Sequence, residues 1–177
     1  MPSLIRRMWR AALLDPDLYD EVESAPHLLR QAFLVVLLVS AAGGVAAGWP
    51  RLGVEALVAL LLFAGWLGWA AVSTWLGTRV MPGPETQSDF PEVLRTIGFA
   101  ASPGLLLVLA FVQETRPAVF VCALLWMLAA TVVAIREALD FASLGRAIVV
   151  CALGWLVQAA AAAVALFLLV WTARTAN

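Results

Sequence analysis

The stretch from Ala56 to Thr78 reads ALVALLLFAGWLGWAAVSTWLGT and contains no charged side chain. A helix rises about 1.5 Å per residue, so a run of roughly 20 residues can cross the hydrocarbon core of a bilayer. Four further charge-free runs are close to that length or longer, and they occupy 31–50, 96–113, 117–135 and 147–173. The chain is 63% hydrophobic and 13% charged. The sequence therefore predicts an all-α, polytopic membrane protein built as a bundle of five transmembrane helices.

The runs divide the chain into two regions. Residues 1–27 are expected to form an amphipathic and acidic amino-terminal segment in the cytoplasm, and residues 28–174 the five-helix transmembrane domain. The expected spans are about 30–49, 54–79, 93–112, 117–136 and 146–172.

The arginines predict the orientation. Eight of the eleven fall on the side of the membrane that holds the amino terminus, and three fall on the other side. Positively charged loops favour the cytoplasmic side. We therefore expect an integral protein of the cytoplasmic (inner) membrane, with its amino terminus in the cytoplasm and its carboxyl terminus outside.

The first residues have an amphipathic pattern. Apolar side chains recur at helical spacing at Leu4, Ile5, Met8, Trp9, Ala12 and Leu13. Arg6, Arg7 and Arg10 lie off this stripe. Such a helix can lie in the membrane plane with its arginines towards anionic headgroups, or it can pack beneath the cytoplasmic ends of the spans. The sequence leaves both placements open.

An acidic stretch follows this helix, with Asp15, Asp17, Asp20, Glu21 and Glu23. So many negative charges would be repelled by an anionic membrane surface. They are expected to project into the cytoplasm or to cover neighbouring arginines. The stretch is either a solvated acidic face or a docking site for a basic partner.

Pro103 interrupts the third expected span. Proline has no backbone N–H, so the carbonyl of Phe99 loses its helical donor and the helix is expected to kink or open near Ser102 and Gly104. Ser102 or a neighbouring helix would supply the missing donor. Transporters also use broken helices as binding sites near the membrane midplane. A structural kink and a substrate site both stay open.

Small and polar residues inside the expected spans indicate where helices pack. Glycine lets two helix backbones approach closely, and a polar side chain in hydrocarbon seeks a hydrogen-bond partner on another helix. This packing can occur within the bundle or between two copies of the chain. The residues assigned to the break and to packing are Gly44, Gly48, Gly98, Ser102, Pro103, Gly104 and Gln158.

Charged residues gather at the expected cytoplasmic ends of the helices. Asp89, Pro91 and Glu92 have the pattern of a helix start with a capping box. Arg136, Glu137 and Asp140 are expected to form a charge network with Arg95 or Arg146. The candidate interaction face consists of Asp17, Tyr19, Glu21, Arg95, Arg136, Glu137, Asp140 and Arg146.

Groups for catalysis are missing from the sequence. His27 is the only histidine and has no cysteine near it, so a transition-metal site is not expected. A Gly-x-Ser-x-Gly nucleophile elbow and a phosphate-binding glycine loop are both lacking. We therefore expect no enzymatic activity, no cofactor and no nucleic-acid partner.

Three segments carry a resemblance to a known family. They are LLDPDLYDEV at 13–22, LRTIGFAASPGLLLVL at 94–109 and WMLAATVVAIREALDFASLGRAIVV at 126–150. The chain resembles short bacterial members of the Yip-one family, membrane proteins first known as partners of Ypt/Rab GTPases. The resemblance implies five spans and a cytoplasmic amino terminus. Eukaryotic members have an Asp-Leu-Tyr-Gly-Pro motif, whereas Asp20 and Glu21 follow Tyr19 here, which argues against a GTPase partner.

Two functions fit these observations. The first is a non-enzymatic membrane scaffold or adaptor that acts through helix packing and its cytoplasmic face. Its partners would be membrane lipid and either another protein or a second copy of the chain. The alternative is a small oligomeric transporter, channel or lipid-handling protein that uses the break at Pro103.

Overall fold

The computed structural model describes residues 3–48, 52–83, 86 and 88–175. The side chains of 47–48, 52–55, 57–58, 158 and 161–175 lie outside this description. The helices, in chain order, are α1 (Leu4–Ala12), α2 (Pro16–Glu23), η1 (Pro26–Leu28), α3 (Leu29–Gly48), α4 (Leu52–Trp75), η2 (Leu76–Val80), α5 (Phe90–Ala100), η3 (Ser102–Phe111), α6 (Arg116–Ala138) and α7 (Leu144–Thr175). No strand occurs in these ranges, and the predicted all-α class is confirmed.

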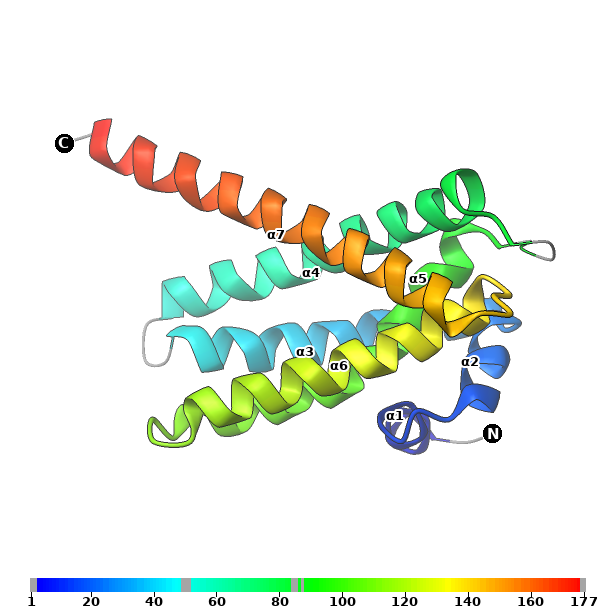
Figure 1. Cartoon of the computed structure of the whole chain (residues 1–177). Coiled ribbons are helices and arrows are strands. Elements are labelled where there is room, and N and C mark those ends of the chain that lie inside the picture. The colour runs from blue at the N-terminus through cyan, green and yellow to red at the C-terminus, as the bar shows by residue number, and fades with distance from the viewer. Residues whose placement is uncertain (1–2, 49–51, 84–85, 87, 176–177) are drawn as a thin grey trace.

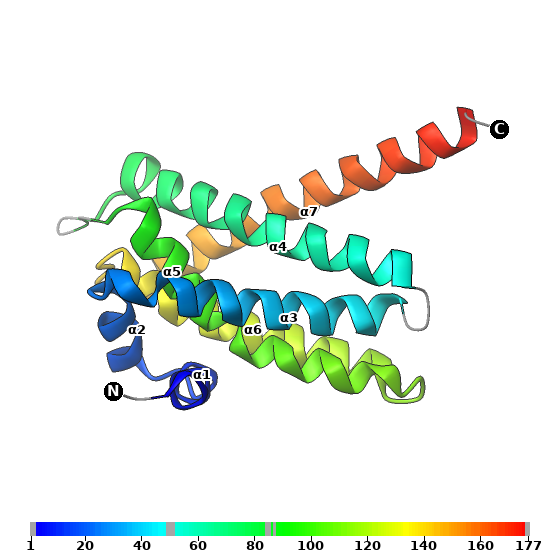
Figure 2. The same cartoon turned by 180° about the vertical axis from the view of Figure 1, so that it is seen from behind.

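The long helices form a bundle with one helix that leaves it. The helices α3 and α4 lie side by side and α6 runs in the same bundle, whereas α7 starts against the bundle and then diverges from it (Figure 1). The helix η3 packs against both α3 and α6. α1 and α2 lie at the end of the bundle where α3 begins and α6 ends, and the axis of α1 runs across the bundle in Figure 1 and Figure 2. The carboxyl-terminal half of α7 projects at the opposite end.

Three helical segments are long and apolar enough to cross a membrane, namely Pro26–Ala46, Ala59–Val80 and Arg116–Ala138. A fourth span results if α5 and η3, which meet at 41°, are one bent span. The apolar helical segment Leu144–Val157 of α7 is shorter than these and is not counted among them. The structure thus shows a helical protein with three or four candidate spans in its described part, and five spans stay a prediction.

The start of α5 has the predicted capping box. The carboxylate of Asp89 accepts from the backbone N–H of Glu92 at 2.9 Å, and the carboxylate of Glu92 accepts from the backbone N–H of Asp89 at 2.9 Å. These two bonds satisfy donors that would otherwise be unpaired in the first turn. The capping box therefore fixes where α5 begins, before the chain enters the bundle.

The amino-terminal segment belongs to the same core as the spans. Leu18, Tyr19 and Val22 of α2 are fully buried, and they share an apolar cluster with residues of α3, α5 and α6 such as Val35 and Phe99. A second cluster joins α4 to α5, α6 and α7. Because α2 contributes large side chains to the first cluster, it is a part of the bundle and holds α1 in place.

Candidate functional site

The structure breaks the third expected span beside Pro103. α5 ends at Ala100, and a 3₁₀ helix, η3, starts at Ser102 and carries the chain on with a bend of 41°. The hydroxyl of Ser102 donates to the carbonyl oxygen of Phe99 at 2.6 Å. That carbonyl is the one that loses its helical donor to Pro103. The break is therefore internally satisfied and needs no donor from another helix at this position.

Two glycines flank the break and allow close packing. A Cβ on Gly98 would lie 2.8 Å from the Cβ of Ala32 on α3. A Cβ on Gly104 would lie 2.6 Å from Cγ1 of Val39 and 2.7 Å from the sulfur of Met127. Contacts this short would require the facing side chains, or at Ala32 the helix α3 itself, to shift. Both positions thus bring the broken helix directly against its neighbours.

A glycine of the first span lies close to the second. Gly43 faces α4, because a Cβ there would lie 2.5 Å from Cδ1 of Leu62. Gly44 is buried, and the side-chain positions of Gly48 and Gln158 lie outside the described residues.

A cavity of about 400 Å³ lies beside the break. Its walls come from α3, α4, α5, η3, α6 and α7, together with the linking Ala101, and they are almost entirely apolar. Three tryptophans line it, Trp66 and Trp69 on α4 and Trp155 on α7. The indole Nε1 of each is buried without a hydrogen-bond partner. This cavity could not be predicted from the sequence, because its walls come from segments that are distant in the chain.

Two arginines of α1 bind side chains of the protein itself. Arg7 is only 4% exposed, and its guanidinium donates to Glu21 at 2.9 and 3.0 Å and to Gln31 at 3.1 Å. Arg10 donates to Glu21 at 2.8 Å and to Asp15 at 2.6 Å. Burial alone would raise the pKa of Glu21, but the hydrogen bonds from Arg7 and Arg10 outweigh it and lower this pKa below its ordinary value. Part of the acidic stretch therefore covers neighbouring arginines, which is one of the two arrangements expected from the sequence.

The apolar stripe of α1 is divided between two sides. Leu4 and Met8 pack against the bundle. Ile5, Trp9 and Leu13 are exposed, with Trp9 66% accessible. The indole of Trp126 on α6 donates to the carbonyl oxygen of Ala12 at 2.7 Å, a bond that ties the end of α1 to the side of the bundle. α1 thus packs on the bundle and still presents an apolar face.

Two members of the expected interaction face are buried, which corrects that expectation. Tyr19 is fully buried, and its hydroxyl donates to the carbonyl oxygen of Ala11 at 3.2 Å. Arg95 is 4% exposed and donates to the carbonyl oxygens of Val22 and Glu23, not to carboxylates of α6. Neither side chain can therefore meet a partner. Both instead hold α1 and α2 on the bundle.

The remaining charges form an acidic cluster at the same end of the bundle. It consists of Asp17, Asp20, Glu23, Glu92, Glu137 and Asp140. Burial, followed by the nearby charges of Asp140, Glu92 and Asp20, raises the pKa of Glu23 to about 7. Burial also raises the pKa of Glu137, although Arg136 pairs with it at 3.3 Å. Arg146 is exposed near the same end.

Part of the acidic cluster lies at the surface of the protein. Within the ranges that the structure describes, no three histidine, cysteine or acidic side chains are placed to hold a metal ion. Asp17, Asp20 and Asp140 are exposed. The cluster draws its carboxylates from α2, α5 and α6, so it depends on the docking of α2 that Arg95 maintains.

Comparison with protein families gives one match. The Yip1 domain family matches residues 10–173, nearly the whole chain. Searches among curated proteins and among solved structures found no match. The matched range takes in the acidic segment, the broken helix and the apolar helices, which together make an integral membrane protein. The chain therefore belongs to the Yip1 domain family.

Proposed function

We propose that this protein is a non-enzymatic scaffold or adaptor of the cytoplasmic membrane, with a cytoplasmic amino terminus, five spans and an external carboxyl terminus. The arginine distribution supports this orientation. The fifth span is α7, whose 32 residues correspond to a length of about 48 Å, more than a bilayer core requires. The placement of α1 and α2 at one end of the bundle and the end of α7 at the other also supports an odd number of spans.

The acidic cluster is the observation that carries the adaptor proposal. The structure assembles six carboxylates from three helices, although burial and then the proximity of the other carboxylates raise the pKa of Glu23. Arg7 and Arg10 pair with Glu21 and Arg95 binds backbone carbonyls, whereas Arg136 pairs with Glu137 of the cluster at 3.3 Å. A basic segment of a partner protein would relieve this repulsion. We therefore assign the partner as a protein with a cationic surface.

The membrane contact of α1 is part of the same proposal. Ile5, Trp9 and Leu13 form an exposed apolar face on a helix that lies across the bundle, as expected of a helix in the membrane interface. A spin label on Trp9→Cys, in a background of Cys122→Ser and Cys151→Ser, should be accessible to oxygen dissolved in the bilayer. Preferential quenching by a water-soluble relaxation agent would show instead that this face lies in water.

Affinity purification from native membranes after crosslinking tests the adaptor role. The wild-type chain should recover a reproducible basic protein. The triple variant Asp17→Asn, Asp20→Asn and Asp140→Asn removes exposed charge from the cluster and should lose that protein. Glu114→Gln removes an exposed charge outside the cluster, between η3 and α6, and should keep it. Recovery of the chain alone, or equal recovery by the triple variant, counts against the adaptor.

The cavity beside the break favours the alternative function, a small transporter, channel or lipid-handling protein. Proteoliposomes that contain wild type or Pro103→Ala separate transport from scaffolding. A transporter that uses the break should show solute or lipid flux in the wild type and a change in the variant. An adaptor should show no flux in either protein.

A further inference from the structure

The helix α1 is attached to the side of the bundle at a defined depth. The indole of Trp126 on α6 donates to the carbonyl oxygen of Ala12 at the end of α1 at 2.7 Å. Trp126 lies ten residues from Arg116 and ten from Arg136, which flank the charge-free part of this candidate span. Its Cα is therefore about 15 Å along the helix from either arginine. The end of α1 lies within side-chain reach of the middle of a span.

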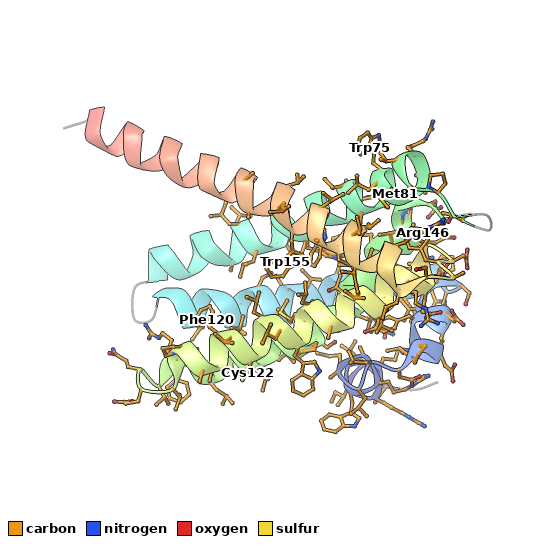
Figure 3. All side chains as sticks on the ribbon, in the orientation of Figure 1. Trp75, Met81, Phe120, Cys122, Arg146 and Trp155 are labelled. Carbon is orange, nitrogen blue, oxygen red and sulfur yellow. The ribbon has the colours of Figure 1, made fainter. Side chains whose placement is uncertain are left out.

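The position of α1 along the bundle agrees with this depth. In Figure 3, α1 (blue, seen along its axis) lies between Cys122 on α6 and Arg146 at the start of α7. Arg146 is exposed at the end of the bundle that carries the acidic cluster. α1 also packs against η3, the helix that follows the break. Since the hydrocarbon core is about 30 Å thick, α1 lies at the level of the acyl chains of the cytoplasmic leaflet.

One row of apolar side chains on α1 points away from the protein. Ile5, Trp9 and Leu13 recur at every fourth position and are 78%, 66% and 61% exposed. Leu4 and Met8, on the other side of the helix, pack against the bundle. An exposed apolar row is unfavourable in water. At the depth of α1, the surroundings that cover this row are acyl chains.

The charges beside this row are paired within the protein. Arg7 and Arg10 pair with Glu21, and Arg10 also pairs with Asp15. These two cations and two anions carry no net charge. Interfacial helices are commonly attracted to anionic headgroups by their basic residues, but in α1 only Arg6 is an exposed arginine. The contact of α1 with the membrane therefore depends on its apolar row.

The bundle holds α1 rigidly. The hydroxyl of Tyr19 donates to the carbonyl oxygen of Ala11 at 3.2 Å, next to the bond from Trp126 to Ala12. Arg7 donates to the side chain of Gln31 on α3 at 3.1 Å. α1 therefore cannot leave a tightly packed leaflet as a free amphipathic helix can. The lipids of that leaflet must separate around it, and they separate more easily where curvature already stretches the leaflet.

We propose that α1 is a wedge in the cytoplasmic leaflet that directs the protein to curved membrane, where this leaflet is convex and its acyl chains are loosely packed. The partner of this surface is thus the acyl region of a lipid leaflet. The inference rests on the proposed membrane contact of α1 and adds to it a dependence on curvature and an independence from anionic lipid. It does not involve the acidic cluster.

Membrane tubes pulled from giant vesicles test the proposal. The full chain carries a dye at Glu114→Cys, in a background of Cys122→Ser and Cys151→Ser. A membrane-impermeant reductant bleaches molecules whose residue 114 faces outwards, so the remaining dye marks molecules whose α1 lies in the convex leaflet of the tube. We expect these molecules to be enriched in the tube by at least about twofold over a lipid dye. Equal density in tube and vesicle would overturn the proposal.

Lipid composition separates the wedge from electrostatic attraction. Enrichment should be the same in phosphatidylcholine alone and in phosphatidylcholine with phosphatidylglycerol, because Arg7 and Arg10 are paired within the protein. Enrichment that requires phosphatidylglycerol would mean that headgroup charge attracts the protein, which contradicts the proposal.

Substitutions of the apolar row give the matched comparison. The triple variant Ile5→Ala, Trp9→Ala and Leu13→Ala shortens only exposed side chains and should lose the enrichment. The control shortens three apolar side chains that are exposed on the spans to a similar degree, and it should keep the enrichment: Leu60→Ala, Val121→Ala and Leu125→Ala. Enrichment of the α1 variant equal to that of wild type would show that the row is not the wedge.

The spin label at Trp9→Cys distinguishes a failure of the wedge from a failure of the membrane contact. The wedge requires that the label be accessible to oxygen in the bilayer and that the protein be enriched in tubes. A label in the bilayer without enrichment would leave the contact in place and overturn the wedge. A label in water would overturn both.

Discussion

The guanidinium of Arg95 on α5 donates through Nε to the carbonyl oxygen of Val22 on α2 at 3.2 Å, across 73 residues of sequence. It also donates to the carbonyl oxygen of Glu23. These carbonyls belong to the last turn of α2, where helical acceptors have no partner within the helix and the helix dipole favours a cation. Arg95 thus replaces the missing donors and attaches α2 to the bundle.

Removal of this attachment should destabilise the protein. Arg95→Leu leaves buried carbonyl groups without a donor, which should lower the free energy of unfolding by about 2–3 kcal/mol. Thermal unfolding of the purified protein in detergent measures the loss. Limited proteolysis should cut the variant first between α1 and α3, because α2 is released.

Arg136 provides the control for this prediction. Its side chain is 44% exposed and pairs with Glu137 at 3.3 Å, and such surface pairs contribute less than about 1 kcal/mol. Arg136→Leu should therefore unfold close to the wild-type temperature. If Arg136→Leu loses as much stability as Arg95→Leu, the loss is caused by removal of a positive charge and not by removal of the hydrogen bonds to α2.

The acidic cluster should make stability depend on pH. Burial and the neighbouring carboxylates raise the pKa of Glu23 from 4.5 to about 7. Between these values the folded protein keeps a proton on Glu23 that the unfolded chain has lost. The contribution of this group to stability is therefore fully present below about pH 4.5 and is lost as the pH rises through about 7.

Glu23→Gln should remove this dependence. The variant cannot ionise at this position, so its unfolding temperature should exceed that of wild type at pH 8 and approach it at pH 5. Thermal unfolding at the two pH values checks the result, with Glu114→Gln as an exposed control outside the cluster. If the unfolding temperature of Glu23→Gln differs between pH 5 and pH 8 as much as that of wild type does, another group causes the pH dependence.

Glu21 should have the opposite pH dependence. Hydrogen bonds from Arg7 and Arg10 overcome the effect of burial and lower the pKa of Glu21. Its contribution is therefore present above the unfolded pKa of about 4.5 and is lost as the pH falls through the lowered folded value. Glu21→Gln should cost about 1–2 kcal/mol at pH 7, a value reduced because the side chain is 33% exposed.

The cost of Glu21→Gln should shrink as the pH is lowered to 3, where the wild-type carboxylate also gains a proton. Chemical unfolding at pH 7 and pH 3 measures both values. Asp17→Asn removes an exposed carboxylate of the same helix and should have little effect at either pH. A cost that is the same at both pH values would mean that the charge of Glu21 is not what Arg7 and Arg10 recognise.

The local features of this fold could be predicted from the sequence. The charge-free run at 117–135 lies inside the helix Arg116–Ala138, because the bilayer fixes the length of an apolar helix. The capping box at Asp89 and Glu92 was also predicted, since its two hydrogen bonds join residues three apart. The Ser102 bond to Phe99 has the same local origin. Each depends on a short segment and on a rule that needs no distant partner.

The features that depend on distant partners could not be predicted. Arg7 is buried because Glu21 and Gln31 reach it from α2 and α3, whereas the sequence pattern left open whether its helix faces lipid headgroups or packs on the bundle. Arg95 was expected in a surface charge network, because its true partners, two backbone carbonyl groups of α2, are distant from it in the sequence. The cavity beside the break was also missed, because its walls come from helices far apart in the chain. Long-range packing decides which charges are buried and where space remains.

The contact between α5 and α3 at Gly98 leads to the last prediction. A Cβ there would lie 2.8 Å from the Cβ of Ala32 and 3.3 Å from the ring of Trp66. Because real Cβ atoms do not approach so closely, Gly98→Ala must push the helices apart and should cost about 1–3 kcal/mol. Gly68 on α4 is the matched control, since a Cβ there would meet nothing within 4 Å.

Alanine also favours a helix over glycine by up to about 1 kcal/mol. Gly68→Ala should therefore be neutral or slightly stabilising, and Gly98→Ala should unfold at a lower temperature than wild type in the same detergent. The two variants add the same methyl group to two apolar helices, so their difference reports on packing and not on helix propensity. If they unfold together, α5 does not approach α3 as closely as Gly98 and Ala32 do in the structure, and the wall of the cavity at the break is wider than described.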